Sequence, residues 1–260
     1  MLKRFMIACS LCLALSAISP LAAQYVRVGG QDQIAMGKLD EMEQLIGPAA
    51  AGQTVDLLTR MGIDPVISKM VVEELLPGQK IELKAIRAHH ETHYGVAFLP
   101  SFRGCYLYLL QGADDDPQNM PWHVIDKQDL NCWNGPSVLE LMALRRDDAD
   151  DLVVHNVNYN HGSGVEEDQT QVFSILNGKL VQTLVTQDFL SEVTLGTEIT
   201  TEHRSTFLRF PDLSLEETRT IAVNDKLEKV ERRYWRWSEQ KHRFLPGRFV
   251  SIVAPGTSKN

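Results

Sequence analysis

The sequence has no excess of positive charge, few cysteines and, after its first 23 residues, no long apolar run. Its 260 residues include 26 lysines and arginines against 34 aspartates and glutamates, which gives a formal net charge of −8. This acidic balance disfavours nucleic acid as a partner, because binding to phosphate groups rewards a basic surface. A hydrophobic content of 43% supports a folded core and argues against a wholly disordered chain.

Sequence motifs of several enzyme classes are also missing. The segment Gly162-Ser163-Gly164 lacks the Gly-x-Ser-x-Gly spacing of a nucleophile elbow. The chain carries no glycine-rich phosphate-binding motif. Acidic residues are so frequent that a pair of them does not mark a catalytic site. The sequence therefore favours a protein that binds a partner over an enzyme.

The first 23 residues have the three-part layout of a secretory signal peptide. Lys3 and Arg4 precede an almost wholly apolar run from Phe5 to Ile18, and small residues follow Pro20. We expect residues 1–23 to be removed on export to the periplasm or the medium. The alternative is an uncleaved anchor, but the apolar run is shorter than the about 20 residues that cross a membrane. We therefore expect no membrane span in the mature chain.

Export would leave two of the four cysteines, Cys105 and Cys132. An oxidising compartment favours a disulfide between them. Such a bond closes a loop of under thirty residues and stabilises the fold by about 3–4 kcal/mol on the chain-entropy model. The alternative is two buried free thiols. Cys9 and Cys12 lie too early in the apolar run to be the lipid-attachment site of a lipoprotein.

Residues 24–78 carry apolar side chains at helical spacing. The pattern predicts helices at about 31–46 and 54–61, and a third that begins with Asp64 as N-cap and Pro65 in the first turn. This helical segment is too short for a core of its own. We expect it to pack against the residues that follow.

From residue 79 to 253 the pattern changes to short apolar runs with turn residues every 8–15 positions. This spacing predicts antiparallel strands rather than strand–helix–strand units. Asn177-Gly178 predicts a tight hairpin, because both residues tolerate positive φ. We expect an α+β, mostly β protein whose antiparallel sheet is propeller-like or a curved meander, with residues 254–260 as a flexible tail.

Residues 143–184 combine an acidic loop, an apolar strand, a glycine-containing loop and a tight turn. This order resembles one repeat unit of the FG-GAP/VCBS type, which builds β-propellers of exported proteins. The resemblance implies a calcium-binding loop in which Asp147 and Asp151 are ligands. Arg145 and Ala143 stand where the family has its two earlier ligands. The alternative is a solvated acidic turn.

A cluster of histidines suggests a second metal site. His89 and His93 share one face if the chain is regular there, and His155 and His161 are candidates to join them from another strand. Imidazole ligands suit zinc or copper. The spacing differs from the metalloprotease motif, which has two residues between the glutamate and the second histidine. Converging ligands are needed for a metal site, and the sequence alone does not show them.

The last strong strand pattern mixes arginines with aromatic residues. In an extended chain Arg233, Trp235 and Trp237 share one face, while Tyr234 and Arg236 share the other. Because Trp, Tyr and Arg dominate interface hot spots, these five residues are a candidate binding surface. The alternative is an ordinary strand whose aromatics pack on the core while arginine stems cover the sheet.

We therefore expect an exported, non-enzymatic binding protein without a cofactor. Its expected partner is a protein or glycan of the cell envelope, and one specific form is an inhibitor or immunity-type protein. The alternative is a metal-dependent enzyme or metal-binding protein. It would use calcium or zinc, the acidic loops and the region from His89 to His93.

Overall fold

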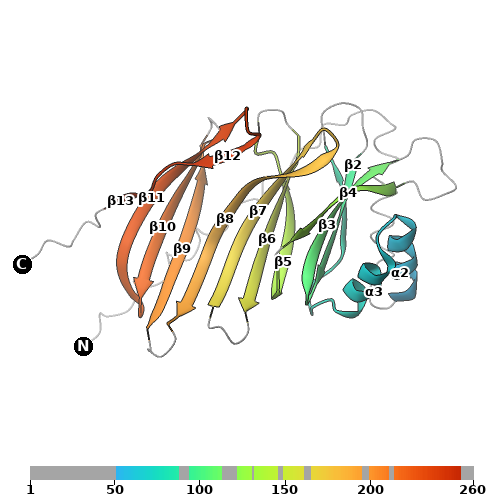
Figure 1. Cartoon of the computed structure of the whole chain (residues 1–260), viewed down its shortest axis with the longest axis horizontal. Coiled ribbons are helices and arrows are strands. Elements are labelled where there is room, and N and C mark those ends of the chain that lie inside the picture. Colours follow the sequence, from blue (N-terminus) through green and yellow to red (C-terminus); the bar gives the residue numbers. More distant parts are fainter. Residues whose placement is uncertain are drawn as a thin grey trace, which may run out of the picture.

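Two short helices are followed by thirteen strands in two antiparallel sheets within the described residues (Figure 1). The computed structural model describes residues 51–87, 94–112, 122–130, 132–145, 149–160, 165–194, 199–210 and 214–252. The mostly β, α+β fold class predicted from the sequence is confirmed. No helix in these ranges is long and apolar enough to cross a membrane.

Helices α2 (Ala51–Arg60) and α3 (Pro65–Glu73) confirm the second and third predicted helices. The carboxylate of Asp64 accepts a hydrogen bond from the backbone N–H of Val66 at 2.7 Å, as an N-cap does. Gly62 has a φ of 94°, which lets the chain turn between the helices. The helix expected at 31–46 lies outside the described residues.

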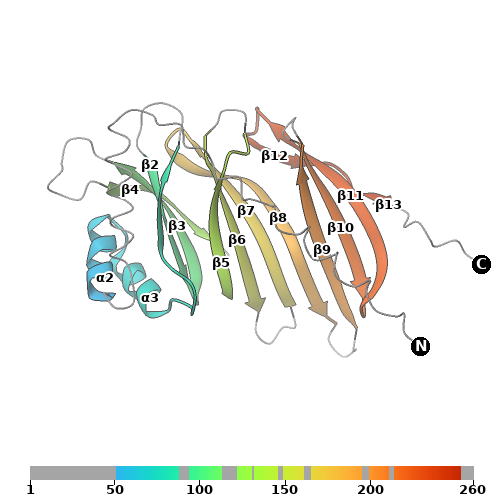
Figure 2. The same cartoon turned by 180° about the vertical axis from the view of Figure 1, so that it is seen from behind.

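The smaller sheet is a four-stranded meander in the order β1-β2-β3-β4. Its strands are β1 (Glu82–Ile86), β2 (Tyr94–Ser101), β3 (Gly104–Gly112) and β4 (Trp122–Leu130). The helices lie against one face of this sheet (Figure 2). Strand β2 is buried on both faces, because the helices cover one and the larger sheet covers the other. The expectation that the helical segment packs on the β region is therefore confirmed for α2 and α3.

The larger sheet has nine strands, and its consecutive strands are neighbours from β5 to β12. They are β5 (Asn134–Met142), β6 (Asp151–Asn160), β7 (Val165–Leu176), β8 (Lys179–Val193), β9 (Thr200–Arg209), β10 (Leu215–Val223), β11 (Lys226–Ser238), β12 (Arg243–Pro246) and β13 (Val250–Ile252). Strand β13 pairs with β11 beside β12. The predicted hairpin joins β7 to β8, with φ of 52° at Asn177 and 70° at Gly178.

Three apolar clusters hold these layers together. One lies between the helices and the small sheet, and a second lies between the two sheets. The third joins distant parts of the larger sheet, because Val153 and Val172 of β6 and β7 pack with Trp235 of β11 and Phe244 of β12. Strand β12 also contacts β8, so the larger sheet bends back on itself. The β region thus forms two packed sheets, one of them a curved meander.

Candidate functional site

The predicted binding strand lies in β11, and its side chains alternate between two faces as expected. Trp235 is only 6% exposed, and the half-buried Trp237 packs edge-on against Phe244 with ring centroids 5.3 Å apart. Tyr234 is 43% exposed and Arg236 is exposed. The five candidate residues therefore do not form one surface.

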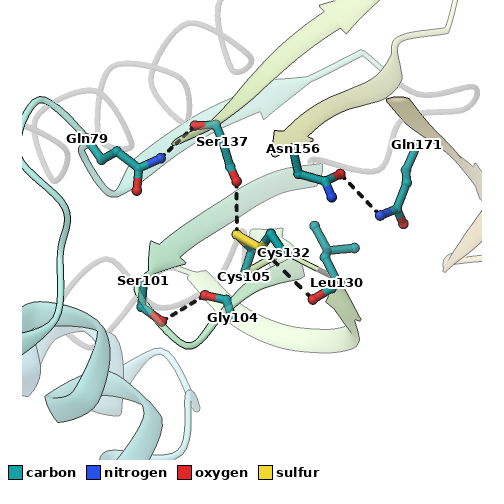
Figure 3. Close-up of a disulfide and its surroundings, with 9 residues drawn as sticks. All are labelled: Gln79, Ser101, Gly104, Cys105, Leu130, Cys132, Ser137, Asn156 and Gln171. Atoms are coloured by element: carbon teal, nitrogen blue, oxygen red, sulfur yellow. Dashed lines mark hydrogen bonds between the residues drawn. A yellow bond between two sulfur atoms is a disulfide. The ribbon is translucent and has the colours of Figure 1, made fainter. Parts of the chain in front are cut away.

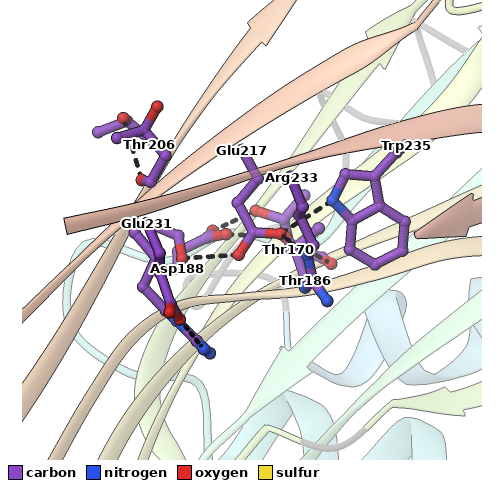
Figure 4. Close-up of polar contacts among 11 residues, drawn as sticks. Thr170, Thr186, Asp188, Thr206, Glu217, Glu231, Arg233 and Trp235 are labelled. Carbon is purple, nitrogen blue, oxygen red and sulfur yellow. Dashed lines mark hydrogen bonds and ion pairs between the residues drawn. The ribbon is translucent and has the colours of Figure 1, made fainter. Parts of the chain in front are cut away.

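The buried face of β11 is organised around Glu217 of β10, which is 2% exposed. Its carboxylate accepts hydrogen bonds from the indole N–H of Trp235 at 2.9 Å and from Nε of Arg233 at 2.5 Å (Figure 4). The hydroxyl of Ser205 donates to its other oxygen at 2.9 Å. The Arg233 guanidinium also lies 4.4 Å from the centroid of the Trp235 ring. These contacts fix Arg233 and Trp235 within the fold.

A second buried carboxylate, Glu231, continues this network. It forms ion pairs with Arg219 and, at 2.5 Å, with Lys229. Burial acts to raise the pKa of Glu231, but the hydrogen bonds from Lys229 and Arg219 outweigh it and hold the pKa below its usual value. The ring of Phe249 lies between the guanidinium groups of Arg219 and Arg233, at 4.0 and 4.2 Å.

The other face of β11 carries an exposed patch. Leu208 of β9 and Tyr234 lie on either side of Glu216 in the paired register, and Leu208 is 57% exposed. Phe210 follows β9, and its ring centroid is 6.3 Å from that of Tyr234. Arg236 lies two residues further along the same face and forms no ion pair with any residue that the structure describes. We call Leu208, Phe210, Tyr234 and Arg236 the Tyr234 patch.

A polar cluster crosses four neighbouring strands of the larger sheet. Nδ1 of His155 in β6 is 2.7 Å from Oγ1 of Thr170 in β7, and the Thr170 hydroxyl donates to Asp188 in β8. Thr186 also donates to Asp188, at 2.8 Å, and Glu140 of β5 is 3.9 Å from Nε2 of His155. Asp188 raises the pKa of His155, burial partly opposes this, and the charge of Glu140 raises it further.

The direction of these hydrogen bonds limits the chemistry of the cluster. A hydroxyl has a single proton to donate, and Thr170 gives it to Asp188. The ring N–H of His155 is then the donor to Thr170, so His155 is not placed as a base that activates this hydroxyl. The cluster is suited to holding β6, β7 and β8 together.

Replacing His155 with glutamine is expected to reduce stability more at low pH than at high pH. The pKa of His155 is higher in the folded than in the unfolded chain. Its contribution to the free energy of unfolding is therefore complete below the unfolded-state pKa and is lost as pH rises through the folded-state pKa. The loss in free energy of unfolding at about pH 5.5 should exceed the loss at about pH 8.5 by about 0.5 kcal/mol. The difference is small because the His155 side chain is partly exposed and solvent screens its charge. Urea unfolding at both values measures it, with the exposed His123→Gln in β4 as control. An equal loss at both pH values would contradict this role.

In the acidic loop that resembles a calcium site, the two aspartates that the structure describes, Asp150 and Asp151, are bound to arginines. Asp151 is 1% exposed and accepts hydrogen bonds from Nε of Arg145 at 2.9 Å, Ser174 Oγ at 2.6 Å and the backbone N–H of Leu144 at 3.1 Å. Burial raises the pKa of Asp151, and the hydrogen bonds from Ser174 and Arg145 act in the opposite direction. An arginine thus stands where the resemblance places a cation.

Its neighbour Asp150 is also bound, because Nη2 and the backbone N–H of Arg87 each donate to it at 2.9 Å. The remaining predicted ligands lie outside the described residues: His89, His93, Asp147 and His161. Within the described ranges no three His, Cys, Asp or Glu side chains are grouped to hold a metal ion. The predicted metal sites therefore stay predictions.

Cys105 and Cys132 lie at disulfide-bonding distance, with Cα atoms 5.8 Å apart (Figure 3). Both are buried in the cluster between the two sheets. The Ser137 hydroxyl of β5 is 3.2 Å from the sulfur of Cys105. The pair therefore joins β3 to the connection between β4 and β5, where the chain passes from one sheet to the other.

Three residues that shape this region were not singled out from the sequence: Glu217, Phe249 and Leu208. No motif marks them, because their roles depend on which strand residues lie opposite one another. Glu217 and Glu231 are bound to arginines, and Asp188 is bound to Thr170 beside His155. The Tyr234 patch is an exposed group on the opposite face of β11. Comparisons of the chain with protein-family models, curated proteins and solved structures found no match.

Proposed function

We propose that the chain is an exported, non-enzymatic binding protein that recognises a protein of the cell envelope through the Tyr234 patch. The observation that carries this proposal is the exposure of Tyr234 and Leu208 on β11 and β9, which flank β10 on either side. The Glu217 network holds the opposite face of β10 and β11. A large apolar or aromatic side chain held on a rigid support loses little entropy on binding. Tyr and Arg are also common hot-spot residues.

The proposed location outside the cytoplasm has two supports. Residues 1–23 have the layout of a signal peptide. Cys105 and Cys132 are also placed to form a disulfide, which persists in oxidising compartments. A function as an inhibitor or immunity-type protein fits a location outside the cytoplasm. Such a protein needs a stable binding surface and no reaction chemistry.

The state of the buried acids supports binding over catalysis. Asp151, Glu217 and Glu231 each accept hydrogen bonds from an arginine. A carboxylate held in such an ion pair stabilises the arrangement of neighbouring strands. The Thr170 hydroxyl donates to Asp188 and accepts from His155, whereas activation of this hydroxyl as a nucleophile would need His155 to accept its proton.

Replacing Tyr234 with alanine is expected to weaken binding of the partner by at least about tenfold, as loss of a hot-spot aromatic does. Residues 24–260 with an affinity tag would capture the partner from envelope extract. After identification and purification of that partner, calorimetry would compare the wild type with the variant.

The matched control is Phe102→Ala in the turn between β2 and β3, because Phe102 is 43% exposed like Tyr234 but lies in the other sheet. The control should bind as the wild type does. An unchanged affinity of Tyr234→Ala would reject the Tyr234 patch as the binding surface. Retention on purified envelope glycan with no protein captured would reject the protein partner.

A further inference from the structure

A second surface lies at the edge of β11, where residues 243–252 run along it as one interrupted strand. β12 pairs with the end of β11 from Trp235 to Ser238, and β13 pairs with Val230 to Arg232. Between them the backbone N–H of Gly247 donates to the carbonyl of Tyr234 at 2.7 Å. The register moves by one residue at this point, as in a β-bulge. We call residues 247–252 the strap.

The strap places one aromatic side chain into a preformed setting. The ring of Phe249 is 4.0 Å from the guanidinium carbon of Arg219 and 4.2 Å from that of Arg233. These arginines are held by Glu231 and Glu217, both 2% exposed. Each guanidinium group is therefore hydrogen-bonded to a buried carboxylate in addition to its contact with Phe249. A ring from another chain would meet the same cation–π partners.

The strap is short, and most of its residues are exposed. Within the described residues three pairs join β13 to β11, and Val250 is 67% exposed. The start of the strap is packed closely, because a Cβ on Gly247 would lie 3.1 Å from the carbonyl oxygen of Tyr234, so opening would begin at the exposed β13 end. Short, exposed edge segments open at a much lower free energy than the whole fold. Opening would uncover the β11 backbone from Val230 to Arg232 and the space between the two arginines.

We propose that the β11 edge is an acceptor site for an extended peptide segment of another protein, and that the strap is its resident occupant. The strap defines the chemistry that fits: an aromatic residue, then alternating apolar and polar residues, as in Phe249-Val250-Ser251-Ile252. The peptide would add as an antiparallel strand and place its ring between Arg219 and Arg233. This site is separate from the Tyr234 patch, because Phe249 and Tyr234 belong to opposite faces of β11.

The test uses a fluorescent synthetic peptide of residues 247–260 and the full chain with Phe249→Ala, which weakens the strap. We expect the peptide to bind this variant at least about tenfold more tightly than the wild type, measured by anisotropy. The peptide with its phenylalanine changed to alanine should lose this binding. Val250→Ala, which alters an exposed strap side chain outside the arginine pair, should behave as the wild type.

The proposal is overturned if a folded Phe249→Ala chain does not bind the peptide, or binds the peptide without its phenylalanine equally well. Phe249→Leu repeats the test if the alanine variant does not fold. Dimers of the wild type formed by strap exchange, seen by light scattering, would make a second copy the occupant and also overturn it. Tyr234→Ala combined with Phe249→Ala should bind the peptide unchanged, which separates this site from failure of the Tyr234 patch.

Discussion

Replacing Asp151 with alanine is expected to lower the free energy of unfolding by about 3–5 kcal/mol, as removal of one partner of a buried ion pair does. Asp151 is 1% exposed, and the side chain of Arg145 is 10% exposed. The substitution leaves this guanidinium without its carboxylate in a place that water barely reaches. It also removes the acceptor for the Ser174 hydroxyl and for the backbone N–H of Leu144.

A double-mutant cycle tests whether the ion pair is the cause. If Asp151 mainly neutralises Arg145, the double variant Arg145→Ala/Asp151→Ala should cost less than the sum of the two single variants. Asp129→Ala is the matched control, because this aspartate is exposed in β4 and 3.8 Å from Lys127. It should change stability by less than about 0.5 kcal/mol. Additive losses in the cycle would show that Arg145 is not the main reason for the effect.

The same variants bear on the resemblance to a calcium-binding repeat. Calcium needs several oxygen ligands around one centre, and Arg145 occupies the neighbourhood of Asp151. We therefore expect calcium and a chelator to leave the unfolding temperature of the wild type unchanged. A calcium-dependent increase that disappears in Asp151→Ala would restore Asp151 as a ligand and would contradict the structural role of the ion pair.

The sequence predicted those parts of the fold that depend on local chemistry. Asp64 followed by Pro65 marks a helix start because an N-cap and a first-turn proline act on the adjacent backbone. Asn177-Gly178 marks a hairpin because both residues must take positive φ. The alternation of β11 followed from the two-residue repeat of any strand, so the buried Trp235 and the exposed Tyr234 were correctly placed on opposite faces.

The contacts that define the candidate site are non-local and could not be found in this way. Glu217 and Arg233 are paired because β10 and β11 meet in one particular register. Arg87 and Asp150 are joined across the boundary between the two sheets. Many acids in the chain are equally plausible partners for each arginine, and a shift of one residue in register would choose others. The distinction between the exposed Tyr234 patch and the buried Glu217 network therefore depends on the strand register, which only the structure provides.

Replacing both Cys105 and Cys132 with alanine is expected to lower the free energy of unfolding by about 3–4 kcal/mol. The two cysteines are 27 residues apart in sequence, and a cross-link of that length removes many conformations from the unfolded chain. The bond also ties β3 to the residues that lead into β5, in the apolar cluster between the two sheets. Guanidinium chloride unfolding of the mature chain, prepared without reductant, measures the change.

Two controls separate loss of the cross-link from loss of packing. The wild type in excess reductant should unfold near the midpoint of the double variant, because both lack the covalent link while only the variant lacks the sulfur atoms. Alkylation before reduction should modify neither cysteine of the exported protein. Two freely alkylated thiols would show that the bond is not formed outside the cytoplasm. The proximity of Cys105 to Cys132 would then reflect packing of two buried side chains between the sheets. The proposal of a location outside the cytoplasm would then rest on the signal-peptide pattern alone.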